Sequence, residues 1–149
     1  MKITRFEDIE AWQLARELCR QVYAAIAANS DFSKDWGLKD QITRAAGSVM
    51  DNVAEGFDGG SRPEFIRFLS YAQRSCAEVQ SQLYRALDCG YINVKQHAEL
   101  YKLAGHACAK IGGLIRYLKA TKHEEQRTKH EEPATLRLHP FSCSSCSPV

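Results

Sequence analysis

The sequence has little proline and few of the alternating apolar and polar stretches that mark half-buried strands. Only four prolines occur in 149 residues, so long stretches lack a helix breaker. The length suits one domain with a substantial core. These absences, together with long helical periods, predict a single all-α domain.

Secretory and membrane features are also missing. The opening MKITRFEDIE has no apolar segment of signal-peptide type, and no apolar run approaches the ~18 residues of a membrane span. We therefore expect a cytoplasmic protein with no membrane partner. In that compartment Cys19, Cys76, Cys89 and Cys108 are expected to be reduced thiols.

No residue pattern typical of an active site is found. There is no nucleophile with a base, and neither His97 nor His106 has the glutamate three residues before it that a di-iron bundle needs. We expect no catalytic residue, no cofactor and no bound metal. A carboxylate pair of Glu55 and Glu78, or a bundle enzyme with a cryptic metal, is the alternative.

Two short motifs resemble parts of ligand sites. Gly59 and Gly60 lack the Lys-Ser/Thr of a phosphate loop and are read as a corner. Cys143 and Cys146 form one C-x-x-C that could supply half a zinc site, but there is no second pair. An incidental tail is the favoured interpretation of the second motif.

Apolar residues recur at three- and four-residue spacing in four stretches, which predicts four amphipathic helices. With three short links, they predict an antiparallel, up-down-up-down four-helix bundle over residues 1–122. The charged run after it predicts a disordered polar tail over 123–149. The expected helices cover about 7–28, 35 or 38 to 56, 63–88 and 93–122.

The chain is organised around residues 41–83, which hold two helical patterns and one corner. Gly56 is expected to end the second helix, and Ser61 and Pro63 to start the third. Further on, Gly90 is expected in a left-handed C-terminal position and Asn93 as a helix cap.

Five residues are expected to hold this central region together. Asn52 falls in the apolar register, so we expect it to find a partner such as a backbone group of a neighbouring helix. Glu55 and Glu78 are expected to act as caps or to pair with Arg44 or a backbone amide, and Gly56 belongs to the corner between the second and third helices. The set is Arg44, Asn52, Glu55, Gly56 and Glu78.

Gly105 and Gly112 lie seven residues apart inside the fourth helix, where each costs about 0.8–1 kcal/mol relative to alanine. Close approach of another helix would compensate. Whether that helix belongs to the same subunit or to another one stays open at this point.

Basic residues on the outer faces of the third and fourth helices are the candidate nucleic-acid contacts. A basic line with one aromatic suits phosphate contacts plus a stacked base, and it suits an ordinary solvated face equally well. The net charge of +2 is only mildly basic. The candidates are Arg67, Tyr71, Arg74 and Arg85, then Lys102, Lys110, Arg116 and Lys119, with His106 among the second set.

Three segments in this order resemble a known family. FEDIEAWQLARELCRQVY, QITRAAGSVMDNVAEGF and RPEFIRFLSYAQRSCAEVQSQL, within about residues 6–120, are similar to the four-helix-bundle proteins encoded in intervening sequences of bacterial 23S ribosomal RNA genes. The resemblance implies a cytoplasmic bundle that assembles into a ring of five and has no known enzymatic activity.

The same fold is similar to the accessory protein of diversity-generating retroelements, a basic pentameric barrel that binds a reverse transcriptase and nucleic acid. The N-V-A-E-G segment places this sequence closer to the first group. The expected function is a non-enzymatic, homo-oligomeric scaffold associated with RNA. The alternative is a protein-binding accessory subunit of a retroelement reverse transcriptase.

Overall fold

The structure, a computed structural model, describes residues 3–130, with the side chains of residues 3–121. This part of the chain is helical and contains no strand, which confirms the all-α class. A 3-10 turn and a five-residue helix accompany four long helices. The elements are η1 (Phe6–Asp8), α1 (Glu10–Ala28), α2 (Ser30–Lys34), α3 (Trp36–Asp58), α4 (Arg62–Asp88) and α5 (Val94–His130).

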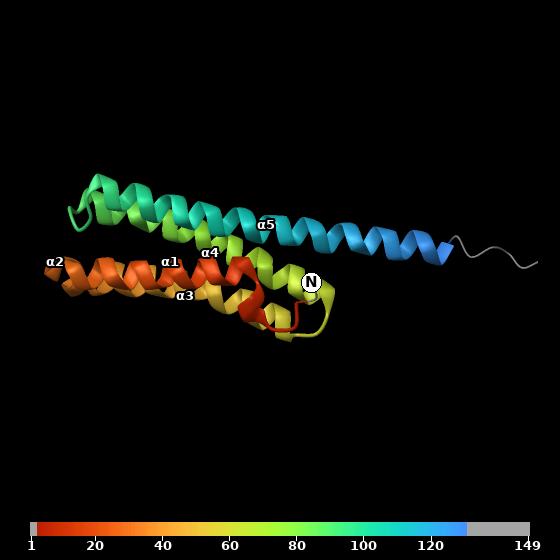
Figure 1. Cartoon of the computed structure of the whole chain (residues 1–149). Helices are drawn as coiled ribbons and strands as arrows, with labels where there is room; N and C mark the ends of the chain where they lie inside the picture. Colours follow the sequence, from red (N-terminus) through yellow and green to blue (C-terminus); the bar gives the residue numbers. More distant parts are fainter. Residues whose placement is uncertain (1–2, 131–149) are drawn as a thin grey trace, which may run out of the picture.

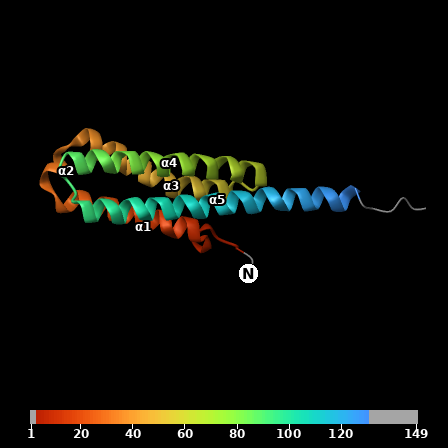
Figure 2. The same ribbon diagram turned by 90° about the horizontal axis from the view of Figure 1, so that it is seen from above.

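The four long helices lie side by side (Figures 1 and 2). Helix α1 packs on α3 and α5, and α4 packs on the same two helices. The links that join α1 to α3 and α4 to α5 lie at one end of the molecule, and the α3–α4 link lies at the other. Helix α5 continues well past the ends of the other helices.

The apolar spacing of α4 places its core residues as predicted. Its apolar side chains, which recur every three or four residues, form a stripe that is fully buried from Leu69 to Ala86. Phe65, one turn before Leu69, is half-buried. Burying such side chains stabilises the bundle by about 1.5–3 kcal/mol for each large one. The buried stripe is Leu69, Ala72, Cys76, Val79, Leu83 and Ala86.

Several helix ends form as expected. The Ser61 hydroxyl accepts a hydrogen bond from the backbone N–H of Glu64 at 3.3 Å, and Gly90 adopts a φ of +73°. Asn93 and Gln96 form a reciprocal capping box, each side-chain oxygen accepting from the other residue's N–H, at 2.8 and 2.9 Å. These contacts fix both ends of the α4–α5 link.

The prediction that Gly56 ends a helix is wrong. Helix α3 continues to Asp58 and is capped at Gly59, and the positive φ of +78° occurs at Gly60. Gly56 is buried inside the helix. A Cβ there would lie 2.7 Å from the Cβ of Phe68 and 2.9 Å from Cδ2 of Phe65, so glycine is required by the close approach of α4.

The segment from Asn29 to Lys34 was predicted to be a link and instead contains α2. The Asn29 side chain caps this helix by accepting from the N–H of Phe32 at 2.9 Å. Phe32 is fully buried and stacks on Tyr91 with the ring centroids 5.1 Å apart. Residues that end one helix therefore start the next, because the same asparagine side chain serves as an N-cap.

Asp35 ties the start of α3 to the α4–α5 link. Its carboxylate accepts from the N–H of Leu38 at 3.0 Å and from the hydroxyl of Tyr91 at 3.1 Å. The Leu38 hydrogen bond, with a smaller contribution from Tyr91, lowers the pKa of Asp35 below its ordinary value of 3.8. Because the folded state holds the charged form better, this stability is present above pH 3.8 and is lost as the pH falls through the lower folded value.

We expect the variant Asp35→Asn to lose stability less steeply than the wild type as the pH falls below about 4, since asparagine keeps the cap but does not titrate. Thermal unfolding from pH 5 to 2 would measure this. An equally steep loss in both proteins would contradict the assignment.

Helix α5 continues to His130, whereas its end was predicted near Lys122. The run HEEQRTKH is rich in good helix formers and contains no glycine or proline, so a charged segment read as tail extends the helix. The rest of the predicted tail, with Cys143 and Cys146, lies outside the described residues. Cys19, Cys76, Cys89 and Cys108 are free thiols, as expected.

Residues 3–130 contain neither a membrane-spanning helix nor a cluster of metal ligands. None of the helices combines the length and apolarity needed to cross a bilayer. Nor do three or more histidine, cysteine, aspartate or glutamate side chains in that part of the chain gather as a metal site would require.

Candidate nucleic-acid interface

The outer side of α4 carries a line of exposed polar residues. Arg67, Tyr71, Arg74 and Arg85 are all exposed, as is Glu78 among them. Their spacing places them on the face opposite the buried stripe. We call Arg67, Tyr71 and Arg74 the α4 basic face, because these three are consecutive along that line.

Each arginine of this face lies near an aromatic ring. The guanidinium carbon of Arg74 is 6.0 Å from the ring centroid of Tyr71, and that of Arg67 is 5.5 Å from the ring of Phe68. Phe68 and Tyr71 themselves meet edge to face, 5.9 Å apart. The arrangement combines cations with a phenol ring that is 40% exposed, which are the groups that bind phosphates and stack on bases.

The charges on this face differ in how far they are neutralised. Arg67 pairs with Glu64 at 3.2 Å, an exposed ion pair worth about 0–1 kcal/mol. Arg74 has no ion pair in the part of the chain that the structure describes. Arg85 donates to the side-chain oxygen of Gln41 on α3 at 2.9 Å, so it leans toward the α3 side.

The four candidates on α5 do not form one line. Lys110 pairs with Glu10 of α1 at 2.9 Å and so faces α1. Arg116 lines the same pocket as Lys110, and its guanidinium also lies 3.6 Å from where a Cβ on Gly112 would be. Lys102 and Lys119 are exposed, with His106 between them along the helix.

The eight candidates therefore do not share one surface. Arg85 contacts α3 from α4, and Lys110 contacts α1 from α5. The α3/α4 side and the α1/α5 side are opposite sides of the bundle, because each of α1 and α4 packs on both α3 and α5. A rigid nucleic-acid segment that contacts the α4 basic face cannot also contact Lys110 of the same subunit.

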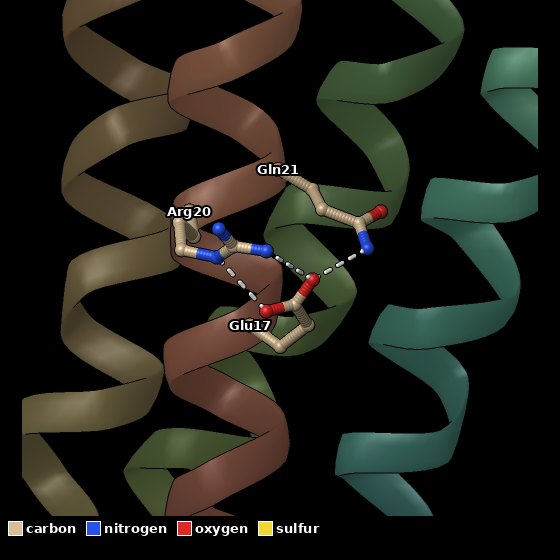
Figure 3. A network of polar contacts seen from close by, with 3 residues as sticks. All are labelled: Glu17, Arg20 and Gln21. Atoms are coloured by element: carbon tan, nitrogen blue, oxygen red, sulfur yellow. Dashed lines mark hydrogen bonds and ion pairs between the residues drawn. The ribbon is translucent and has the colours of Figure 1, made fainter.

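Helix α1 carries two arginines, Arg16 and Arg20, that are not among the candidates predicted from the sequence. Glu17 accepts hydrogen bonds from Arg20 at 3.0 and 3.2 Å and from Gln21 at 2.8 Å (Figure 3). These bonds, those of Arg20 foremost, lower the pKa of Glu17. Arg16 lies over the Trp12 ring at 5.8 Å. Only the three-residue spacing of Glu17 and Arg20 signalled this network in the sequence.

The residues predicted to hold the bundle together through polar contacts act mostly within their own helices. Arg44 is exposed and pairs with Asp40 at 3.1 Å, not with Glu55 or Glu78. Glu55 is exposed, and Glu78 accepts from Gln82 one turn later on the same helix at 3.2 Å. Surface carboxylates find partners one turn away more readily than partners on another helix.

Asn52 also finds its partners on its own helix. Its amide donates to the carbonyl oxygen of Ser48 at 2.7 Å and to the Ser48 hydroxyl at 2.9 Å. The contact between helices is made by Ser75 of α4, which is buried and donates to the same hydroxyl at 2.9 Å. One sign of this contact is present in the sequence, since Ser75 is a polar residue directly before the apolar position of Cys76.

The helix glycines of α5 lie against side chains of α4 of the same subunit, which is one of the two alternatives left open above. The Gln73 amide lies 2.9 Å from where a Cβ on Gly112 would be, and the Gln80 amide lies 3.4 Å from the equivalent point on Gly105. The two amides donate to the carbonyls of Cys108 and Tyr101, at 3.4 and 3.3 Å.

Comparisons with known proteins agree with this architecture. Residues 7–113 match the model of a family described as 23S rRNA-intervening sequence protein. A search of curated proteins finds no match. The crystal structure of a protein with unknown function from the S23 ribosomal protein family of Bacteroides thetaiotaomicron is similar, with a TM-score of 0.63 and 19% identity. The likeness covers 70% of this chain and 97% of that one, and it shows a common fold.

Proposed function

This chain belongs to the 23S rRNA-intervening sequence protein family, and we propose that it is a non-enzymatic scaffold that binds RNA in the cytoplasm. The proposed scaffold is an antiparallel bundle that forms a homo-oligomer, a ring of five as the family resemblance implies. The α4 basic face makes the contacts with RNA.

One observation carries this proposal. Tyr71 is exposed on the outer face of α4, with an arginine one turn before it and another one turn after it. Arg74 lies over its ring and has no ion pair among the described residues. A cation without a carboxylate partner is available to a phosphate, and an exposed phenol offers a surface to a base.

Assembly strengthens such a face without changing it. A single copy offers two arginines on the α4 basic face, which is a modest charge. A ring repeats the face once per subunit, so a long RNA can contact several copies and gain affinity from each additional contact.

The variant Arg67→Glu with Arg74→Glu tests the proposal. We expect its affinity for 23S ribosomal RNA fragments to fall about tenfold or more at low salt, because two phosphate contacts become repulsive. The dependence of log affinity on log salt concentration should become shallower by roughly 1–2. Fluorescence anisotropy across a salt series would measure both, with the oligomer mass recorded on the same sample.

Helix α1 provides a matched control. The double variant Arg16→Glu with Arg20→Glu changes the net charge by the same amount. It also removes the same kinds of contact, because Arg16 lies over an aromatic ring and Arg20 forms an ion pair with a glutamate three residues away. This control should bind RNA with less than a threefold loss. Equal losses in both double variants would mean that only net charge matters. Unchanged binding in the α4 variant would refute the assignment, and an intact oligomer that binds no RNA would favour a protein-binding role.

A further inference from the structure

Three aromatic rings meet between α4 and α5, near the link that joins these helices and outside the apolar core. The ring of His97 lies 4.5 Å from that of Tyr84 and 5.6 Å from that of Tyr101, and the two tyrosines are 5.7 Å apart. Tyr84 is 51% exposed and Tyr101 is 37% exposed. None of the three belongs to either core cluster. We call this group the aromatic triad.

The triad includes a polar atom without a partner. Nε2 of His97 is buried, and no hydrogen-bond partner reaches it in the part of the chain that the structure describes. A buried nitrogen of this kind ordinarily has a hydrogen-bond partner.

Each exposed tyrosine is followed by a basic residue that turns away from the triad. Arg85 follows Tyr84 on α4 and donates to Gln41 of α3. Lys102 follows Tyr101 on α5 and lines a pocket with Gln21 of α1. The exposed tyrosine rings themselves are therefore the surface that a ligand can cover, and exposed rings are what proteins present to the bases of single-stranded nucleic acid.

We propose that the aromatic triad is a stacking site for unpaired bases of single-stranded RNA. This inference rests on the proposed RNA-binding function and names the form of RNA that this end of the bundle takes. An unpaired base has a free face that can cover a tyrosine ring, whereas the bases of a duplex are already stacked on each other. The site is separate from the α4 basic face, which contacts the backbone of structured RNA.

Binding of a 12-nucleotide oligouridylate, compared with an abasic strand of the same length, tests the site. We expect the wild-type protein to bind the oligouridylate more tightly. Tyr84→Ala with Tyr101→Ala should lose about 10- to 100-fold in affinity for it and fall to the abasic level, since stacking contributes about 1–3 kcal/mol per base. Binding of the abasic strand should stay within threefold.

Two further variants exclude simpler explanations. Tyr84→Phe with Tyr101→Phe keeps the rings and should keep the affinity. Tyr23→Ala with Tyr117→Ala removes two other exposed tyrosines, 57% and 65% exposed, and should leave binding within threefold of wild type. Circular dichroism and oligomer mass, recorded for every variant, show whether each is folded and assembled.

Three results would overturn the proposal. The wild-type protein could bind structured ribosomal RNA but not the oligouridylate, which leaves the proposed function standing without this site. The alanine variant could bind both strands as the wild type does. Its oligomer mass could fall, with phenylalanine failing to restore binding, in which case the triad is a contact between subunits.

Discussion

Replacing Gly56 with alanine is expected to destabilise the protein by about 2–3 kcal/mol, although alanine is the better helix former. The added methyl group would overlap the Cβ of Phe68 at 2.7 Å, and Cβ atoms cannot move without their backbone. Helices α3 and α4 must therefore separate locally, which is the usual cost of overpacking a core. The gain of about 1 kcal/mol in helix propensity is too small to compensate.

Gly47 in the same helix is the matched control. A Cβ there meets only the Asp51 carboxylate, at 4.0 Å, so Gly47→Ala should stabilise the protein by up to about 1 kcal/mol. The same substitution then has opposite signs at two positions nine residues apart. Urea unfolding at one protomer concentration measures both, since assembly would make stability depend on concentration. Stabilisation by both variants would show that α3 and α4 are not in close contact at Gly56.

Replacing Phe32 with alanine is expected to cost about 3–5 kcal/mol, the range for deleting a buried phenyl ring. The ring is 1% exposed, and it stacks on Tyr91, which in turn hydrogen-bonds Asp35. Removing it leaves a cavity where α2 and the α4–α5 link meet. Neither segment has another large buried aromatic to fill that space among the described residues.

Trp36 serves as the control for this change. It is a larger aromatic four residues away, but it is 72% exposed and contacts Lys39, whose Nζ lies 4.1 Å from the ring. Trp36→Ala should cost less than about 1 kcal/mol. If both alanine variants lost similar stability in urea, the buried position of Phe32 would be wrong.

The four long helices and their buried faces could be predicted from the sequence, because the spacing of apolar residues shows directly which side of a helix is buried. The three- and four-residue spacing from Leu69 to Ala86 identified a stripe that is buried throughout. The same reasoning correctly placed Arg67, Tyr71 and Arg74 on the exposed side. Both results depend only on the geometry of one helix.

Errors arose where a residue's role depends on another element. A glycine after an apolar run looks the same whether it ends a helix or lets another helix approach, and only the position of Phe68 distinguishes the two cases at Gly56. Likewise, the pairing of Lys110 with Glu10 requires α1 to lie beside α5. The sequence placed the two basic sets on two helices, and only the structure shows that Arg85 contacts α3 while Lys110 contacts α1.

The paired glutamines and glycines between α4 and α5 have a consequence for folding. Gln73 with Gly112 and Gln80 with Gly105 repeat the same contact after seven residues on both helices. Sliding one helix along the other by two turns, about 10 Å, would place Gln80 beside Gly112 or Gln73 beside Gly105. Each displaced alignment keeps one of the two contacts, so this interface discriminates weakly against a slide. The link from Cys89 to Asn93, whose last residue caps α5, is too short to permit such a slide. A chain cut within that link would lose this constraint, and its two fragments would then associate in competing alignments.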